Sequence, residues 1–254
     1  FDALIASALE HTVDDDGDGR PDRYGLVFNQ KEPFWLVPFL GAFGGWVMDE
    51  QSRPTLDGEA MRRALAFTAA LKHEHGIIPQ ECDYDTAEAL FKEGKAAFQI
   101  NGPWSWQGYI DAGIELGLAP IPEIVGAGWP APAVSVKGYS LNSNARGERR
   151  ADALLLLRFL TGEWVQARLA AGLGVIPSRL AAGAAAEGAN PLVAPSRAQM
   201  LHGRPMPVVP EMRAIWDTAR PEFQAVMGGS RSPAEAAAAM QDAALRKIAE
   251  MKGE

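Results

Sequence analysis

The 254-residue sequence predicts an α/β fold. Amphipathic helices alternate with single short strands through the first 142 residues, a pattern typical of α/β proteins rather than of helical bundles. Two irregular stretches, 120–132 and 180–192, divide the chain, so we expect one lobe to be built from non-contiguous pieces. No internal repeat is visible.

The first half of the chain carries the alternation. A helix is expected over 2–13, because Leu4, Ile5 and Leu9 recur at helical spacing. An Asp/Gly-rich turn then leads into a buried strand over 23–29. The further elements expected here are a helix from Glu32-Pro33 to Gly44-Gly45, a helix over 55–76, a helix from the capping-box pattern of Asp85 and Glu88 to Gly94, a strand over 95–101, a helix from 103, and a short strand over 116–119.

The second half is mainly helical. A strand is expected over 133–142, and the stretch 180–192, rich in Ala and Gly, is interpreted as a connector. The pattern Ser232-Pro-x-Glu235 is a capping box that starts the last helix. The helices expected in this half are 148–160, 162–171, 193–202, 210–227 and 232–251.

Charge and hydropathy exclude several classes of partner and location. The formal net charge of −8 argues against nucleic acid or an anionic membrane as a partner. No segment approaches the roughly 18 unbroken apolar residues that a membrane span needs. The first residues, from Phe1, resemble the middle of an amphipathic helix rather than a signal peptide, so we expect that an upstream segment has been removed.

The sequence offers no catalytic motif. Cys82 is the sole cysteine and is expected to be a structural thiol, since Asp83 and Asp85 would raise its pKa. His73 and His75 lie two residues apart on one helix and therefore do not share a face for a metal ion. There is no nucleophile elbow, phosphate-binding loop or dinucleotide fingerprint, so we expect a protein that is not an enzyme.

An aspartate-rich loop leaves two interpretations open. Asp14, Asp16, Asp18 and Gly19 match the first half of a calcium-binding loop of the EF-hand type. The bidentate glutamate that such a loop requires is replaced by Gly25, although Asp22 is a partial substitute. The alternative is a polar helix-to-strand turn, in which Asp and Gly are favoured for their backbone geometry.

Aromatic residues give the strongest functional signal. Several of the seven tryptophans lie beside turns or helix starts rather than in apolar runs, namely Trp35, Trp104, Trp106 and Trp216. An indole stacks on the apolar face of a sugar ring, while carboxylates and arginines pair with its hydroxyls. For any single tryptophan, core packing is the default interpretation. The combinations Glu-Pro-Phe, Asn-Gly-Pro-Trp and Trp-x-x-x-Arg therefore matter more than the count.

Those three combinations resemble motifs of the maltose/maltodextrin-binding proteins of ABC importers. The stretch from Ala87 to Trp106, with Asn-Gly-Pro-Trp near its end, is similar to one family segment, and Phe28–Phe34 is similar to the family's Glu-Pro-Tyr loop. Met206–Trp216 resembles the late Met-Pro-x-x-Pro-x-Met segment, which is followed by Trp and Arg. A weaker match extends over nearly the whole chain.

The resemblance implies a sugar site. Trp104 and Trp216 would stack on glucosyl rings, Glu32 would accept hydrogen bonds from hydroxyls, and Arg220 would reach the same ligand. Two positions depart from the family. Phe34, which follows Pro33, stands where the family has a tyrosine and lacks the hydroxyl. Asp217 stands where the family has a second aromatic residue, so the contact of that aromatic residue with the sugar is lost or replaced by a polar one. The ligand-binding residues expected from the resemblance are Glu32, Pro33, Phe34, Trp104, Trp216, Asp217 and Arg220.

The resemblance also implies a periplasmic-binding-protein-like fold of two hinged lobes, here an incomplete chain with one lobe mostly present. Residues 1–120 and 190–254 would form the C-terminal lobe, 133–185 a returning segment of the N-terminal lobe, and 121–132 and 186–189 the hinge crossovers. The implied protein is periplasmic or extracellular, binds maltose or maltodextrin, and delivers the sugar to the membrane subunits of an ABC permease. Another oligosaccharide, such as trehalose or sucrose, is a variant of this hypothesis.

Two other hypotheses stay open. One is a carbohydrate-active enzyme, which the lack of catalytic motifs disfavours. The other is a fragment that binds no sugar and acts through association with another chain. The returning helices would expose an apolar face, so we expect it to be covered by a complementing N-terminal chain, by intermolecular pairing or by homo-oligomerisation. The leucines expected on that face are Leu154, Leu155, Leu156, Leu157 and Leu160.

Overall fold

The larger of the two units in this computed structural model, which describes residues 1–253, contains a parallel pair of short strands. Strand β1 (Tyr24–Val27) pairs with β2 (Ala96–Gln99), with Leu26 opposite Phe98. A second parallel pair joins β3 (Ala133–Val134) to β4 (Arg204–Pro205). These strands belong to the segments 121–134 and 202–254, which are part of the same larger unit. The alternation of helices with single strands thus gives a mixed α/β fold, as the sequence predicts.

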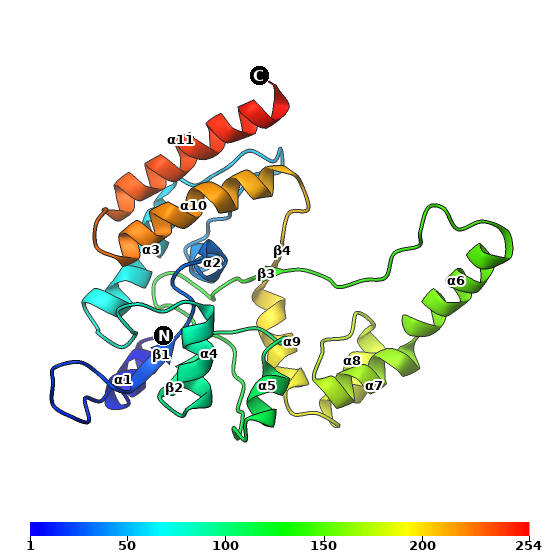
Figure 1. The fold of residues 1–254 in the computed structure, drawn as a ribbon, viewed down its shortest axis with the longest axis horizontal. Coiled ribbons are helices and arrows are strands. Elements are labelled where there is room, and N and C mark those ends of the chain that lie inside the picture. Colours follow the sequence, from blue (N-terminus) through cyan, green and yellow to red (C-terminus); the bar gives the residue numbers. More distant parts are fainter. Residues whose placement is uncertain (254) are drawn as a thin grey trace. The chain divides into compact units, whose positions relative to one another are not determined.

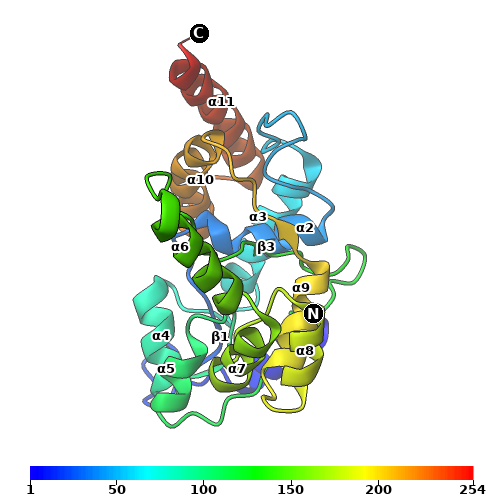
Figure 2. The same cartoon turned by 90° about the vertical axis from the view of Figure 1, so that its right-hand side faces the viewer.

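Helices α1 and α4 contact the β1–β2 pair, and the other helices of the unit pack on one another around an apolar core. The helices of this unit are α1 (Asp2–Glu10), the 3₁₀ turn η1 (Pro33–Trp35), α2 (Val37–Ala42), α3 (Glu59–His73), α4 (Tyr84–Lys92), α10 (Glu211–Met227) and α11 (Pro233–Lys252). Figures 1 and 2 both show α10 and α11 side by side. Leu26, Phe39, Leu65 and Phe223 are among the fully buried side chains of one cluster that joins these elements.

The smaller unit comprises 102–120 and 135–201. Its helices are α5 (Trp106–Asp111), α6 (Gly147–Leu160), α7 (Glu163–Leu173), α8 (Leu180–Glu187) and α9 (Val193–His202, except for its last residue). A small cluster of Ala170, Ala186 and Val193 joins three of them. The family resemblance instead implies that 102–120 belongs to the same lobe as 1–101. That lobe assignment stays a prediction.

Several expected elements are wrong or shorter. The stretch 116–119 is irregular, and the strand expected over 133–142 is limited to Ala133–Val134. The connector expected over 180–192 instead contains α8, because its run of alanines favours a helix over a loop. Helix α4 is capped by Asp83, whose carboxylate accepts from the backbone N–H of Thr86, rather than by Asp85.

The helix expected from Glu32-Pro33 to Gly44-Gly45 is instead the 3₁₀ turn η1 followed by the short helix α2. The remaining helices confirm the predicted ones to within a few residues at each end. The capping box at Ser232 is present: the Ser232 hydroxyl accepts from the Glu235 backbone, and the Glu235 carboxylate accepts from the Ser232 N–H. Pro221 lies inside α10 without ending it. Within 1–253, no helix is long and apolar enough to cross a membrane.

Gly25 provides a test of how α1 packs on β1. A methyl group at Gly25 would collide with the backbone of Ala8, which is fully buried. We expect Gly25→Ala to lower the free energy of unfolding by about 2–4 kcal/mol, because neither backbone moves without disturbing the core. Chemical denaturation measures the loss. Gly117→Ala, which adds its methyl in open space, is the matched control, and equal stability of the two variants would contradict this packing.

Candidate functional site

A bidentate ion pair between Glu32 and Arg220 organises the candidate site on the larger unit. Glu32 is the residue before η1, and Arg220 lies in the middle of α10. Arg220 Nε donates to Glu32 Oε1 at 2.8 Å, and Arg220 Nη2 donates to Oε2 at 3.0 Å. The side chain of Arg220 is 40% exposed and that of Glu32 is 42% exposed, so both are accessible from solvent. The hydrogen bonds to Glu32 raise the pKa of Arg220.

Asp217 extends this pair towards α11. Its Oδ2 accepts from Lys247 Nζ at 2.6 Å, and its Oδ1 lies 3.9 Å from Arg220 Nη1. Arg213 Nε lies 4.0 Å from the same carboxylate. The hydrogen bond from Lys247, and then the charges of Lys247, Arg213 and Arg220, hold the pKa of Asp217 below its ordinary value. The site therefore combines two carboxylates, of Glu32 and Asp217, with three cations, of Arg220, Lys247 and Arg213. Arg220 lies near both carboxylates.

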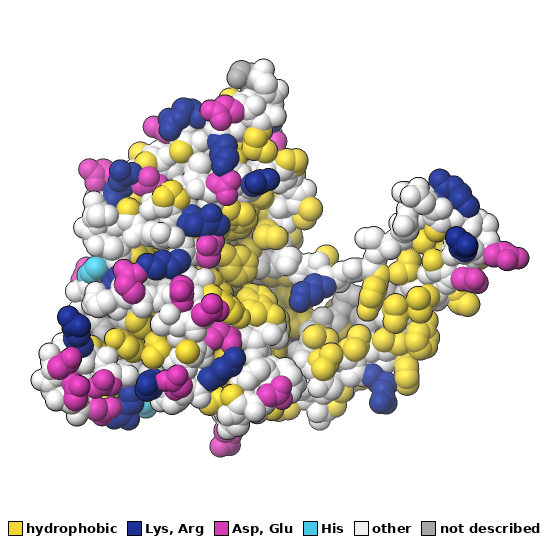
Figure 3. Space-filling model, viewed as in Figure 1, with side chains coloured by type: hydrophobic (Ala, Val, Ile, Leu, Met, Phe, Trp, Pro, Cys, Tyr) yellow, Lys and Arg dark blue, Asp and Glu magenta, His cyan; other side chains and the backbone are white. Residues whose placement is uncertain are grey.

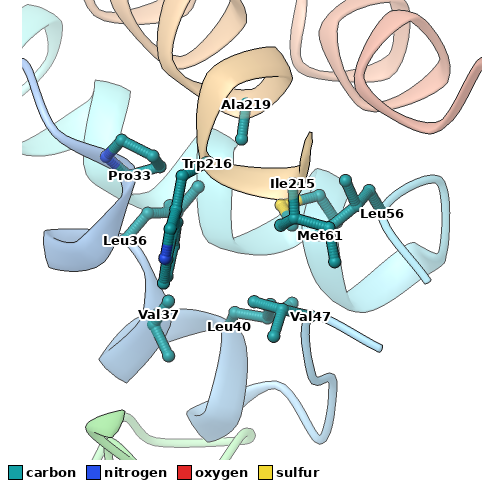
Figure 4. Close-up of a pocket in the computed structure, with 10 residues that line it drawn as sticks. All are labelled: Pro33, Leu36, Val37, Leu40, Val47, Leu56, Met61, Ile215, Trp216 and Ala219. Carbon is teal, nitrogen blue, oxygen red and sulfur yellow. The ribbon is translucent and has the colours of Figure 1, made fainter. Parts of the chain in front are cut away.

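Trp216 lies one helical turn before Arg220, and residues four apart share a helix face. Figure 4 shows its indole extending from α10 towards Val37, with Leu36 beside it and Pro33 above. The space among these side chains is only about 10 Å³, which is no more than one water molecule needs. One part of the indole is thus packed against η1 and α2, while the residue as a whole stays half-buried. The residues around this space are Pro33, Leu36, Val37, Leu40, Val47, Leu56, Met61, Ile215, Trp216 and Ala219.

Phe34 lies in η1, two residues after Glu32. Pro33 is buried at the first position of η1, where its ring matches the backbone angle and its missing N–H costs nothing. Phe34 is half-buried and contacts Trp35 edge to face, with ring centroids 5.5 Å apart. Trp35 is buried, so packing is its role.

Trp104 belongs to the smaller unit, just before α5, and is 50% exposed. Gly102 explains the glycine of the Asn-Gly-Pro-Trp motif, because a methyl group there would collide with the Trp104 indole. The neighbouring Trp106 is buried, which confirms packing as its role.

The structure brings six of the seven expected residues into one region of the larger unit: Glu32, Pro33, Phe34, Trp216, Asp217 and Arg220. Trp104 lies on the smaller unit. Lys247 is the residue that the sequence analysis missed. It lies on α11, 30 residues from its partner Asp217, and no motif marks it.

The aspartate loop is exposed and held by its own hydrogen bonds. Carboxylate oxygens of Asp14, Asp16 and Asp18 lie within 4.8 Å of one another. Asp14 accepts hydrogen bonds from the backbone N–H groups of Gly19 and Gly17. The bond from Gly19 lowers the pKa of Asp14 most, and the bond from Gly17 lowers it further, while desolvation opposes them. Asp22 accepts from the Asp15 N–H. Such bonds are those of a polar turn, and calcium binding stays the untested alternative.

Cys82 is a buried thiol, and His73 contacts the backbone at the end of α10. Burial, and then the charge of Asp83, raises the pKa of Cys82 to about 12, so its thiolate is scarce at neutral pH. His73 Nε2 lies 3.1 Å from the Met227 carbonyl, next to buried Lys72, whose ammonium donates to the same oxygen. These groups cap the end of α10.

Comparison with known proteins gives consistent matches. A model of the family described as bacterial extracellular solute-binding protein matches residues 6–195. A maltotriose-binding protein of Pyrococcus abyssi (strain GE5 / Orsay) is 31% identical over 206 residues, which cover 78% of this chain and 44% of that protein. A galactooligosaccharide-binding protein of Bacillus subtilis (strain 168) is 25% identical over 229 residues, covering 84% and 53%.

Solved structures agree with these matches. The maltose/maltodextrin-binding domain MalE from Bdellovibrio bacteriovorus, bound to maltotriose, is similar with a TM-score of 0.85 and 44% identity, covering 98% of this chain and 66% of that one. A cyclo/maltodextrin-binding protein complexed with maltotetraose is similar with a TM-score of 0.84 and 27% identity, covering 98% and 64%. The chain thus spans about half the length of the curated relatives it matches.

Proposed function

The chain belongs to the bacterial extracellular solute-binding protein family, with the periplasmic-binding-protein-like fold, and we propose that it binds a maltodextrin-type oligosaccharide without catalysing its cleavage. Membership of this family implies a location in the periplasm or at the cell surface. The sugar would lie along the face of the larger unit that carries Glu32, Trp216 and Arg220.

The observation that carries the proposal is the half-exposed Glu32–Arg220 pair beside Trp216. The ion pair leaves lone pairs on Glu32 and N–H groups on Arg220 that sugar hydroxyls can use. Trp216 supplies a flat apolar surface for the C–H face of a ring, and Phe34 supplies a second aromatic surface nearby. An arrangement of this kind suits a neutral, hydroxyl-rich ligand.

The ligands named for similar proteins support this choice of sugar. Relatives and similar structures are described with maltotriose, maltotetraose or maltooligosaccharides. One relative is described as binding galactooligosaccharides, so trehalose, sucrose and other oligosaccharides stay as variants to be tested. Trp104 is the further stacking residue that the sequence predicts.

Delivery to a membrane permease is the second part of the proposal. Relatives in Streptococcus pneumoniae are described as maltooligosaccharide ABC transporter solute-binding lipoproteins. We propose the same partner, the membrane subunits of an ABC importer, for this protein.

The substitution Trp216→Ala tests the sugar site. Titration with maltotriose is expected to change the tryptophan fluorescence of the wild-type chain saturably, and Trp216→Ala is expected to weaken binding about tenfold or more, because the stacking surface is lost. Maltose, trehalose and sucrose are compared in the same assay, and chromatography of the mixtures is expected to show no cleavage products.

Trp164→Ala is the control for loss of a tryptophan outside the proposed site, because Trp164 lies on α7 of the smaller unit. The proposal fails if none of the four sugars gives a response from the wild type. A response that appears only after an N-terminal segment is joined to the chain would favour the interpretation as a fragment.

A second candidate function, association with another polypeptide, rests on the apolar surface of the smaller unit. Among the described residues, α6 has no buried side chain, and Leu155, Leu156 and Phe159 are 69%, 55% and 58% exposed. Figure 3 shows hydrophobic side chains gathered over the segment that carries α6 and α7. Trp164 adds to this surface at 64% exposed. Monomeric soluble proteins seldom expose so much contiguous apolar area.

Light scattering tests this association. At micromolar concentration we expect the wild-type chain to form dimers or larger assemblies, and the triple variant Leu155→Ser, Leu156→Ser, Phe159→Ser to shift towards monomer, since three apolar contacts are removed. A wild-type chain that stays monomeric would contradict the proposal. The exposed leucine of α11, Leu245→Ser, provides the control for a general change in solubility.

A further inference from the structure

The two oxygens of Asp217 have different surroundings. Oδ2 accepts a 2.6 Å hydrogen bond from Lys247. Oδ1 lies 3.9 Å from Arg220 Nη1, which is too long for a direct hydrogen bond, and accepts no hydrogen bond from any residue within 1–253. One oxygen thus fixes the orientation of the carboxylate, and the other is left as an available acceptor.

The guanidinium of Arg220 is divided in a similar way. Nε and Nη2 are both used by Glu32 in the bidentate pair. Nη1, the nitrogen that faces Asp217 Oδ1, donates no hydrogen bond to any described residue. An available donor and an available acceptor therefore face each other, on side chains that are 40% and 34% exposed.

We propose that Asp217 and Arg220 form a binding pair for a single sugar hydroxyl, which makes Asp217 a specificity-determining residue of the site. A hydroxyl oxygen about 2.8 Å from both atoms fits the 3.9 Å gap, and it accepts from Nη1 while it donates to Oδ1. This inference rests on the proposed function, since it assumes that the sugar reaches Arg220.

The chemistry of the pair selects a group that is both donor and acceptor. The contacts with Lys247, Arg213 and Arg220 lower the pKa of Asp217, so its carboxylate is ionised at neutral pH and accepts only. A ring or glycosidic oxygen has no proton to donate to Oδ1, and a carboxylate substituent would be repelled by it. A free hydroxyl satisfies both partners.

The position of Asp217 makes this contact a property of this chain. Asp217 stands where the family resemblance implies an aromatic residue. An aromatic side chain there contacts the face of a sugar ring, whereas the Asp217–Arg220 pair contacts one hydroxyl at its edge. Discrimination between sugars that differ at that one hydroxyl is the expected result, because an unpaired polar group is left when it is missing.

Calorimetric titration with maltotriose and a set of its monodeoxy analogues tests the inference. In the wild type, the analogue that lacks the bridging hydroxyl is expected to bind about five- to tenfold more weakly than maltotriose, because it loses this contact. Asp217→Ala is expected to weaken maltotriose binding and to reduce the difference in affinity between maltotriose and that analogue, because one of the two partners of the hydroxyl is gone while Arg220 remains.

Two further variants make the result specific. Asp242→Ala, which removes an exposed aspartate from α11, is expected to leave every affinity unchanged. Lys247→Met keeps the carboxylate of Asp217 but removes the group that orients it, and is expected to reduce the discrimination partly. Thermal melting of each variant verifies that it is folded.

The outcomes separate this inference from the proposed function. If Asp217→Ala leaves affinity unchanged, or weakens maltotriose and every analogue by one common factor, then Asp217 does not recognise a hydroxyl and the inference is wrong while sugar binding stands. If the wild type binds neither maltotriose nor any analogue, the proposed function fails and this inference fails with it.

Discussion

The bidentate contact between Glu32 and Arg220 is the constraint on which the candidate site depends. It joins the loop after β1 to the middle of α10, across 188 residues of sequence. Both side chains are about 40% exposed, and exposed ion pairs contribute roughly 0–1 kcal/mol, so the pair adds little to stability. Its effect is geometric. The apolar packing of Leu36, Leu40 and Ile215 joins the segment after Glu32 to α10, and the pair then fixes which donors and acceptors face the solvent.

Local pattern was sufficient to predict most helices of the larger unit, because their apolar spacing and caps agree with how they pack. The capping box at Ser232 and the long helices α3 and α10 are examples. The errors arose where one local signal had two meanings. An Ala/Gly-rich stretch suits a flexible connector as well as a helix, and here it forms α8. Short apolar segments such as 116–119 form a strand only when a neighbouring strand pairs with them, which sequence spacing does not show.

The sequence motifs identify most residues of the candidate site, but they do not predict which side chains contact one another. Glu32, Trp216 and Arg220 were singled out by their residue types and order, and the structure places all three in one region of the larger unit. The contact of Lys247 with Asp217 was not predictable, since it depends on the packing of α11 against α10 and carries no motif. The substitution of Asp217 for an aromatic residue was visible in the sequence. Its consequence, a carboxylate with one engaged and one available oxygen, became visible only in the structure.

The central claim is that Trp216, beside the Glu32–Arg220 pair, receives the sugar. The most direct measurement is a two-dimensional ¹H–¹⁵N NMR titration of the tryptophan indole N–H signals with maltotriose, with each signal assigned from single Trp→Phe variants. The Trp216 signal is expected to shift saturably, while the signal of Trp164 on α7 is expected to stay in place. Saturable shifts confined to other tryptophans, with Trp216 unchanged, would contradict it.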